Sequence, residues 1–527
     1  MKARIQTSAT IRAAAIKSGA QVFRARTQSL PPPTGGWNAR DSLADMPPDD
    51  AVQLTNWFPL TTDVMVRRGY EVWATGLTGQ VESLMPYNSA TASTLFAASS
   101  TFFYNVTNPG AVGAPVQSGL TNARWQSVNF ATSGGKFLYA VNGSDKPRLW
   151  DGSNWTSIDS GSTPAITGVT TTKLIHVNVF KRRLWFVEKE SLKVWYLPVD
   201  SIGGAAQSLD FSSIAGLGGY LMAMGTWTID SGTGADDLAV FVTSEGQVIV
   251  YRGIDPANEV TWALAGVWSV GSPIGRRCFQ KFGGDLLLLA FDGLFPMSQL
   301  LQANTVDLKS ALSDKIRLAM SDAVSAYSSN FGWDITVYPK GNMVIVNVPV
   351  AEGSSQQQFV MNTINQAWCN FTGWTANCFM LFDDEPYFGV NGSVYKAWQD
   401  FSDNVADITG TALQAFNYFG SRGQEKRFTM LRPLINTNGT PAVLAGVNVD
   451  YSLEPPTAPA VFSPTSQSYW DSALWDAGIW GGLYVLKDWQ GVNGIGYCAA
   501  PVLTAAVNGI ELHWMASDIV MEPGAVI

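Results

Sequence analysis

The sequence predicts an all-β protein in which a β-propeller is followed by a C-terminal β-sandwich-like domain. Three observations lead to this prediction: a hairpin of two wholly apolar strands, its recurrence along the chain, and a composition with 50 Gly, 20 Trp and only 14% charged residues. Many glycines indicate many turns, and few charges indicate much buried or interfacial surface. At 527 residues the chain is long enough for several domains without disulfide or metal support.

The hairpin lies at Leu238–Gly253. The apolar runs Leu238–Val242 and Val248–Tyr251 flank a Ser-Glu-Gly-Gln turn, in which Gly246 supplies the positive φ that a tight hairpin needs. Neither run alternates polar with apolar residues, so neighbouring sheets are expected to cover both faces of each strand. One hairpin cannot fold alone, and a repeat of it would provide those neighbours.

Stretches resembling this hairpin recur over residues 81–403. Subtracting neighbouring strand positions gives spacings of about 43 to 57 residues, close to the size of a four-stranded propeller blade. The count predicts six or seven blades that bury both faces on one another around a closed ring. Asn-Gly and Asp-Gly pairs are expected to turn inner hairpins. The strand positions are Thr94, Phe137, Arg183, Leu238, Leu286, Met343 and Tyr387, and the turn pairs are Asn142-Gly143, Asp292-Gly293 and Asn391-Gly392.

Residues 1–34 are expected to form a basic N-terminal arm. Six Lys or Arg residues lie between Lys2 and Arg26, and no acid precedes Asp41. Such a composition fits a transit peptide, an arm that docks on an acidic neighbour, or a mobile tail. Pro31-Pro32-Pro33 stiffens the chain and ends the arm.

Residues 35–80 are predicted to be a lead-in segment that packs on the other domains. Asp49-Asp50, after two prolines, is expected to open a short helical turn, and Val64–Arg67 is expected to form a strand. A second departure from the blade pattern is the stretch 307–329. Leu312, Ile316 and Met320 are spaced by four there, which predicts a helix inserted between two blades.

Residues 404–527 are expected to form the sandwich-like domain. Stretches 416–435 and 446–453 are typical of strands, and a Pro-rich loop covers Glu454–Pro464. Trp470, Trp475 and Trp480 then follow at intervals of five, which fits neither the helix nor the strand period. These rings are expected in a loop, serving either a protein contact or a local aromatic core.

The sequence contains little that points to catalysis. There are two histidines, His176 and His513, each within an apolar stretch, so both are expected to be strand residues and not general bases or metal ligands. No zinc-protease, nucleophile-elbow or phosphate-loop motif occurs. We therefore expect no enzyme, no cofactor and no metal, and we assign no catalytic, cofactor-binding or metal-binding residue.

A propeller glycosidase is the enzymatic alternative. Ser157–Thr163 matches the Asp-box pattern S-x-D-x-G-x-T, and Thr228–Gly232 is a partial second match. The carboxylate of such a box braces a blade turn and is structural. Catalysis requires two facing carboxylates about 5–9 Å apart. The one dense acidic run, Asp383-Asp384-Glu385, is expected to be a solvated loop.

The cysteines and the hydropathy of the chain indicate the cellular compartment in which the protein is expected to assemble. Cys278, Cys369, Cys378 and Cys498 show no metal or redox spacing, so we expect reduced core thiols and assembly in a reducing cytosol. No apolar run approaches the ~18 residues of a membrane span, and Lys17 interrupts any signal-peptide core.

Two segments resemble a known family. GGWNARDSLADMPPDDAVQLTNWFP…VRRGY, at residues 35–70, is similar to the opening of a family of short-tailed bacteriophage virion proteins. FNYFGSRGQEKRFTMLRP and WDSALWDAGIWGG resemble the end of the same family. These are propeller-containing tail-tube proteins, similar in role to the tail nozzle (tail tubular protein B), and the two signatures bracket nearly the whole chain.

The resemblance implies a homohexameric ring in the phage tail, assembled in the bacterial cytoplasm. The ring would attach below the head–tail adaptor, meet tail-fibre, spike or tail-tip proteins, and conduct double-stranded DNA during ejection without binding it specifically. A net charge of −9 per chain fits this use, because a negatively charged lumen would repel phosphate. The alternative from another class is a receptor-binding or glycan-binding propeller at the tail periphery.

Overall fold

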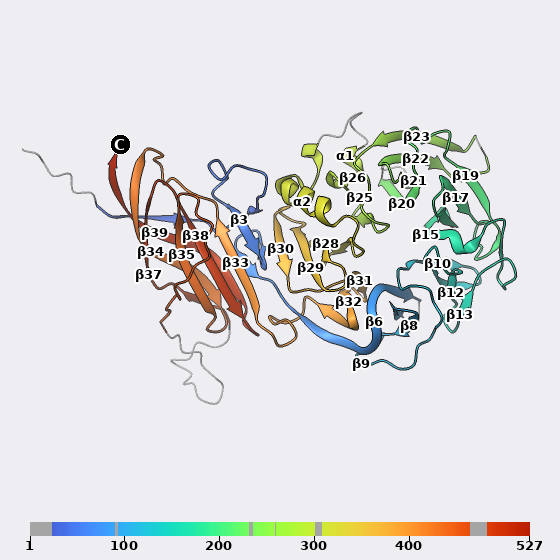
Figure 1. The fold of residues 1–527 in the computed structure, drawn as a ribbon, viewed down its shortest axis with the longest axis horizontal. Helices are drawn as coiled ribbons and strands as arrows, with labels where there is room; N and C mark the ends of the chain where they lie inside the picture. Colours follow the sequence, from blue (N-terminus) through green and yellow to red (C-terminus); the bar gives the residue numbers. More distant parts are fainter. Residues whose placement is uncertain are drawn as a thin grey trace, which may run out of the picture.

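The computed structural model describes residues 24–89, 93–230, 235–258, 260–300, 308–463 and 482–526. The fold is all-β, with 54% strand and 5% helix, and it includes a β-propeller arrangement. The propeller occupies one end of an elongated molecule, and a second group of sheets occupies the other (Figure 1).

Five small antiparallel sheets form propeller blades. The strands of each sheet follow one another in the chain, because short turns connect them. The sheets are β6–β7–β8 (Tyr70–Asn88, Ser93–Ser99, Phe102–Asn105), β10–β11–β12–β13 (Gln126–Thr132, Gly135–Val141, Arg148–Trp150, Trp155–Ser157), β15–β16–β17–β19 (Leu174–Phe180, Arg183–Glu188, Lys193–Tyr196, Gln207–Asp210), β20–β21–β22–β23 (Leu221–Asp230, Ala235–Thr243, Gln247–Gly253, Trp262–Ser269) and β24–β25–β26 (Phe279–Phe282, Asp285–Ala290, Gly293–Pro296).

Further strands lie between the last of these sheets and the first. A meander of β27 (Asp334–Tyr338), β28 (Met343–Ala351), β29 (Ser355–Asn362) and β30 (Trp368–Thr372) is followed by β31 (Cys378–Phe382) and β32 (Glu385–Ala397). β32 pairs with the first half of β6, whereas β7 pairs with its second half. Contacts run from β6 to β10, β15, β20, β24, β27, β31 and back to β6, so the first strands of successive sheets close a ring.

The hairpin Leu238–Gly253 confirms the prediction of burial on both faces. It consists of β21 and β22, joined through Gly246 at φ +79°. Val240, Val242 and Val250 pack in the core shared with β25, β26 and α2 (Arg317–Tyr327). Phe241 and Ile249 point the other way, into the core shared with β16 and β17.

Most of the remaining strands form two sheets that share one hydrophobic core. One sheet has the order β36 (Tyr484–Leu486), β34 (Gln424–Thr437), β39 (Leu512–Val526), β5 (Val64–Val66), β4 (Trp57–Pro59), with β1 (Arg26–Leu30) on β39 and β37 (Gln490–Gly496) on β34. The other continues the β27–β30 meander through β3 (Asp50–Thr55), β33 (Ile408–Gln414), β38 (Ala499–Val507) and β35 (Ala442–Val449), with β2 (Gly36–Trp37) on β3. Trp57, Phe428, Leu431, Leu503 and Trp514 lie in the common core.

The propeller and this double-sheet body are joined by a continuous sheet and a buried ion pair. β3 lies between β30 of the propeller side and β33 of the body. Next to this junction, the Arg67 side chain is 1% exposed and donates to both carboxylate oxygens of Asp403, at 2.8 and 2.6 Å. Arg67 also donates to Asn56 Oδ1 at 2.9 Å and to the Thr372 carbonyl at 2.6 Å. A buried cation so fully bonded fixes the two parts against each other.

Several sequence predictions are wrong. Asp49-Asp50 opens no helical turn, because β3 begins at Asp50, whose buried carboxylate accepts from Lys315 Nζ at 2.5 Å. Asn391-Gly392 is no hairpin turn but an irregularity inside β32, where the register against β6 shifts. The helix α2 is shorter than 307–329, and Leu312 lies before it.

Other predictions are met or lie outside the described residues. β5 covers most of the predicted strand Val64–Arg67. A turn joins β25 to β26 next to the predicted position, but it consists of Phe291 and Asp292, because Gly293 is the first residue of β26 and pairs with Ala290. β1, within the predicted arm, pairs with β39, while β6 crosses the expected boundary at residue 80. The three tryptophans Trp470, Trp475 and Trp480 lie outside the described residues.

Candidate functional site

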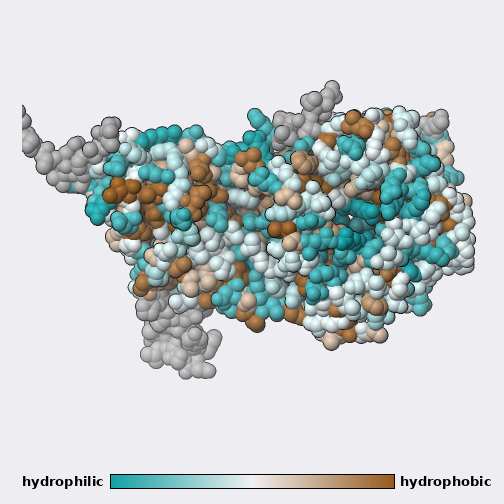
Figure 2. Space-filling view, viewed as in Figure 1, coloured by the Kyte–Doolittle hydropathy of each residue, from teal (hydrophilic) through white to brown (hydrophobic). Residues whose placement is uncertain are grey.

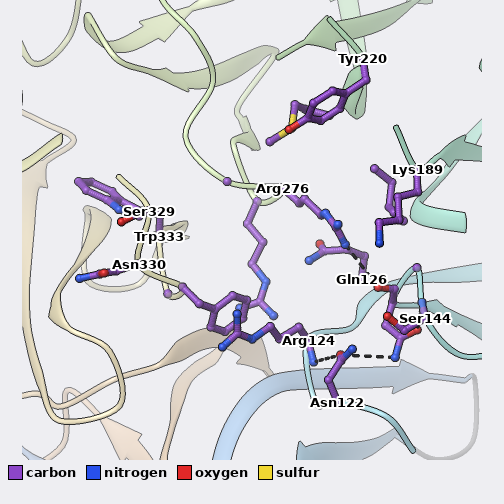
Figure 3. A pocket seen from close by; sticks show the side chains of 18 of the residues that line it. Asn122, Arg124, Gln126, Ser144, Lys189, Tyr220, Arg276, Ser329, Asn330 and Trp333 are labelled. Carbon is purple, nitrogen blue, oxygen red and sulfur yellow. Dashed lines mark hydrogen bonds between the residues drawn. The ribbon is translucent and has the colours of Figure 1, made fainter. Parts of the chain in front are cut away.

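Two cavities lie where the first strands of the sheets converge. One, of about 310 Å³, is lined by residues of β6, β10, β15, β20, β24, β27 and β31. The other, of about 400 Å³, opens among the loops on one side of these strands (Figure 3). Gln126, Arg276 and Arg277 line both cavities, so the two are neighbours along the propeller centre.

The larger cavity is rich in cations, and most of them have an acidic partner. Arg124 Nε contacts Glu82 Oε1 at 3.0 Å, and its Nη2 contacts Glu352. Lys189 Nζ lies 3.7 Å from Glu190. Both arginines 124 and 277 also lie over the ring of Phe331, at 4.3 and 5.3 Å from its centroid, where a guanidinium is attracted by the aromatic face.

Arg277 has its own acidic partner in the smaller cavity. Its Nη1 lies 3.6 Å from Asp334 Oδ2, and its Nη2 donates to the Glu82 carbonyl and to Ser83 Oγ, both at 2.8 Å. Burial raises the pKa of Asp334 to about 6, although the charge of Arg277 opposes that rise. The carboxylate of Asp334 is therefore largely charged at neutral pH and compensates the charge of Arg277.

Arg276 differs from these cations. Among the described residues it has no ion pair, and its one hydrogen bond is a long one, from Nη1 to the Asn142 carbonyl at 3.4 Å. Burial lowers the pKa of Arg276; the neighbouring Tyr220 opposes this effect, and the nearby charge of Arg124 adds to it. Arg276 is thus a half-buried cation whose charge nothing in the described part of the chain neutralises.

The two histidines lie in different environments. His176, on β15, lines the smaller cavity, and its buried Nδ1 has no partner in the described residues. Burial, aided by the charge of Arg276, lowers the pKa of His176 to about 4. His513, on β39, contacts Asp63 at 2.9 Å and Glu511 at 3.1 Å. Burial alone would lower its pKa, but these two hydrogen bonds outweigh burial and raise it.

Neither central cavity brings together the two carboxylates that a glycosidase uses. Each cavity is lined by a single carboxylate, Glu190 in the larger and Asp334 in the smaller. Asp383 and Asp384, both at positive φ, form the exposed turn between β31 and β32. No group of His, Cys, Asp and Glu that could hold a metal ion occurs among the described residues.

The Asp-box match is a turn outside both cavities. Asp159 Oδ1 accepts from the Gly161 N–H at 2.8 Å, and Asp159 Oδ2 contacts Lys146 Nζ at 2.5 Å. The carboxylate therefore braces its own turn after β13, as expected for a structural role. The partial match at Thr228–Gly232 lies partly outside the described residues.

The four cysteines are buried and form no disulfide, as predicted for core thiols. Burial raises the pKa of Cys278 and of Cys378 to about 12, so these thiols stay protonated at neutral pH. Within the described ranges, no helix is both long and apolar enough to cross a membrane.

Sequence reasoning did not single out Arg276. The stretch Gly275-Arg276-Arg277 precedes β24 and looks like an ordinary basic turn. What distinguishes Arg276 is that acids from distant segments neutralise Arg124 and Arg277, and Glu190 neutralises Lys189, whereas Arg276 is left unmatched among the described residues. That imbalance exists only after folding.

Comparisons with known proteins give a distant structural likeness alone. No protein-family model matches the chain, and no curated protein matches it either. One similar solved structure is described as the crystal structure of BBS1N in complex with ARL6DN, soaked with lead. It is 8% identical, with a TM-score of 0.40, and the match covers 64% of this chain and 99% of that chain. A likeness of this size carries no argument about function.

Proposed function

We propose that the protein is a structural component of a short-tailed phage virion, a hexameric nozzle below the head–tail adaptor that conducts DNA during ejection. The observation that carries the proposal is where the resembling segments lie. Residues 35–70 supply β2, β3, β4 and β5, which join the propeller to the double-sheet body, and residues 416–433 run into β34 of the same body. The segments that resemble the family therefore lie at the junction of the two parts. This placement fits a structural subunit, because such a subunit needs a fixed orientation between its two parts.

The electrostatic and packing features support a structural role over an enzymatic one. The junction cation Arg67 is fully bonded and buried, and each central cavity presents one carboxylate where glycoside hydrolysis requires two. The peripheral glycan-binding or glycosidase propeller remains the second candidate. It is favoured only by the propeller fold itself, which hosts many functions.

Exposed apolar surface supports assembly with further copies. β23 is the edge strand of its sheet, and its stretch Ala263-Leu264-Ala265 is exposed. Val260, 92% exposed, and Ile254, 69% exposed, lie beside it. On the double-sheet body, hydrophobic residues gather over the region of β34 and β39 (Figure 2). Apolar edges and faces of this kind are typical of protein interfaces, and two different patches allow the heterologous contacts that close a ring of copies.

The finer architecture is part of the same proposal. We interpret the ring of contacts through β6, β10, β15, β20, β24, β27 and β31 as seven blade positions, the upper value of the predicted range. In this interpretation, the first half of β6 joins β31 and β32 in the blade that closes the propeller. The double-sheet body then serves as a sandwich-like platform for contacts between copies or with the adaptor.

Negative-stain electron microscopy of the purified chain tests the proposal. Rings with sixfold rotational symmetry and a continuous bore are expected. Monomers or trimers that bind immobilised glycans would favour the peripheral propeller and refute the nozzle. An electrostatic map of the ring would test the lumen separately, because a positively charged bore contradicts passage of DNA without adsorption.

A further inference from the structure

The larger central cavity contains an excess of hydrogen-bond donors around one uncompensated cation. Arg276 enters the cavity from the segment before β24, while Arg124 and Lys189 reach it from other sides (Figure 3). Arg124 and Lys189 are paired with carboxylates, as described above. Four of the five guanidinium N–H donors of Arg276 have no acceptor in the described residues.

Several neutral side chains around the same cavity are also uncommitted. The side chains of Gln126, Ser144, Tyr220 and Ser329 make no hydrogen bond to another described residue, although all four residues line the cavity. Each of these groups offers a hydroxyl or amide donor. The cavity therefore presents a guanidinium and several free donors, and its lining contains one carboxylate, Glu190, which Lys189 already neutralises.

We propose that this cavity is a binding site for a small oxyanion, a carboxylate or phosphate group of a soluble ligand, held by Arg276 and the surrounding donors. Arginine matches both kinds of oxyanion, because its planar fork donates two parallel hydrogen bonds. A cavity of about 400 Å³ is within the range of small-molecule sites. A bound anion would supply the missing counter-charge and the acceptors that the wall lacks.

The chemistry also explains why the site is distinct from the smaller cavity beneath it. There, Arg277 is neutralised by Asp334, and the unpartnered nitrogen of His176 belongs to a side chain that burial keeps neutral. Lys281, an exposed lysine without an ion pair among the described residues, also lines the smaller cavity, so charge alone does not separate the two cavities. The uncommitted hydroxyl groups of Ser144, Tyr220 and Ser329 line only the larger cavity, and the oxyanion is therefore expected there.

Isothermal titration calorimetry on the full chain tests the site, with inorganic phosphate and succinate as probes and chloride at equal ionic strength as the reference. Saturable binding of at least one probe is expected, and chloride should not compete. The substitution Arg276→Gln should weaken that binding about tenfold or more, as expected for loss of a charge-assisted pair. Lys189→Gln, at a half-exposed position, should weaken it less.

Arg252→Gln is the matched control. Arg252 is an exposed arginine on β22 without an ion pair among the described residues, and its replacement should leave binding unchanged. Circular dichroism and melting curves of Arg276→Gln report whether the fold is intact, and Lys189→Gln provides a second measurement if it is not. Binding of phosphate alone or of succinate alone identifies which oxyanion the site takes. Absence of binding by both probes, or equal affinity in wild type and both cavity variants, overturns the proposal. Neither result depends on the sixfold ring.

Discussion

Replacing Arg67 by Ala is the most direct test of how the two parts of the molecule are held together. The side chain makes five hydrogen bonds: two to Asp403, and one each to Asn56, the Thr372 carbonyl and the Arg68 carbonyl. Arg67 is 1% exposed and Asp403 is 11% exposed, so little water reaches the pair. Removing one member of such a buried pair costs about 3–5 kcal/mol, because the other charge stays buried and unpaired.

Urea denaturation followed by tryptophan fluorescence measures this loss. Arg427→Ala is the control, because Arg427 and Glu522 form an exposed pair at 4.0 Å and such pairs contribute less than about 1 kcal/mol. In a double-mutant cycle, adding Asp403→Ala to Arg67→Ala should recover part of the lost stability, since no charge is then left buried. If Arg67→Ala shifts the unfolding midpoint no more than Arg427→Ala does, the ion pair does not hold the junction and our reasoning is refuted.

Three further predictions concern the hairpin, the C-terminal histidine and the exposed edge. Gly246→Val should destabilise the propeller by about 2 kcal/mol or more, because φ is +79° and a Cβ would lie 2.1 Å from the Val270 carbonyl oxygen; thermal melting checks this, and an unchanged melting temperature would contradict it. The pKa of His513 is raised, so the contribution of this histidine to stability is complete below its ordinary pKa of 6.5 and is lost as pH rises through the folded-state pKa. NMR titration measures the folded-state pKa. The substitution His513→Gln should flatten the pH dependence of stability. Val260→Asp combined with Leu264→Lys should leave the melting temperature unchanged but reduce ring formation, as measured by size-exclusion chromatography with light scattering. Leu217→Lys, at another exposed apolar position, should not reduce ring formation. Rings that persist in the double variant would exclude this edge as an interface.

The local pattern of hydrophobic residues was sufficient to predict the structure where the same kind of packing contact recurs along the chain. The hairpin around Gly246 was predictable because both faces of its strands are apolar, and each face packs against a different neighbouring sheet. The helix α2 was predictable for a similar reason, since the buried Met320 lies on it and the buried Ile316 immediately precedes it as its N-cap. Such signals depend on the period of hydrophobic residues, which the sequence contains directly.

The local sequence pattern did not predict the structure where contacts with residues distant in the sequence determine it. Asn391-Gly392 has the chemistry of a turn, but the long strand β6 pairs across it and turns it into an irregularity of β32. Asp50 follows two prolines as a helix start would, yet its pairing with Gly36 and the ion pair with Lys315 draw it into a strand. The unmatched charge of Arg276 depends on which acids reach its neighbours, and no sequence window contains that information.

The chain order within the double-sheet body sets the sequence of events during synthesis. β4 and β5 emerge from the ribosome before the propeller, but their sheet is completed by β39, which pairs with β5 and with β1. These early strands must therefore wait while more than 400 residues between Val66 and Leu512 are translated. We expect the propeller to fold first and to hold Tyr70 beside Ala397, where β6 and β32 pair. The folded propeller then holds the two flanking segments close together, so that β39 can pair with β1 and β5 once it has been synthesised.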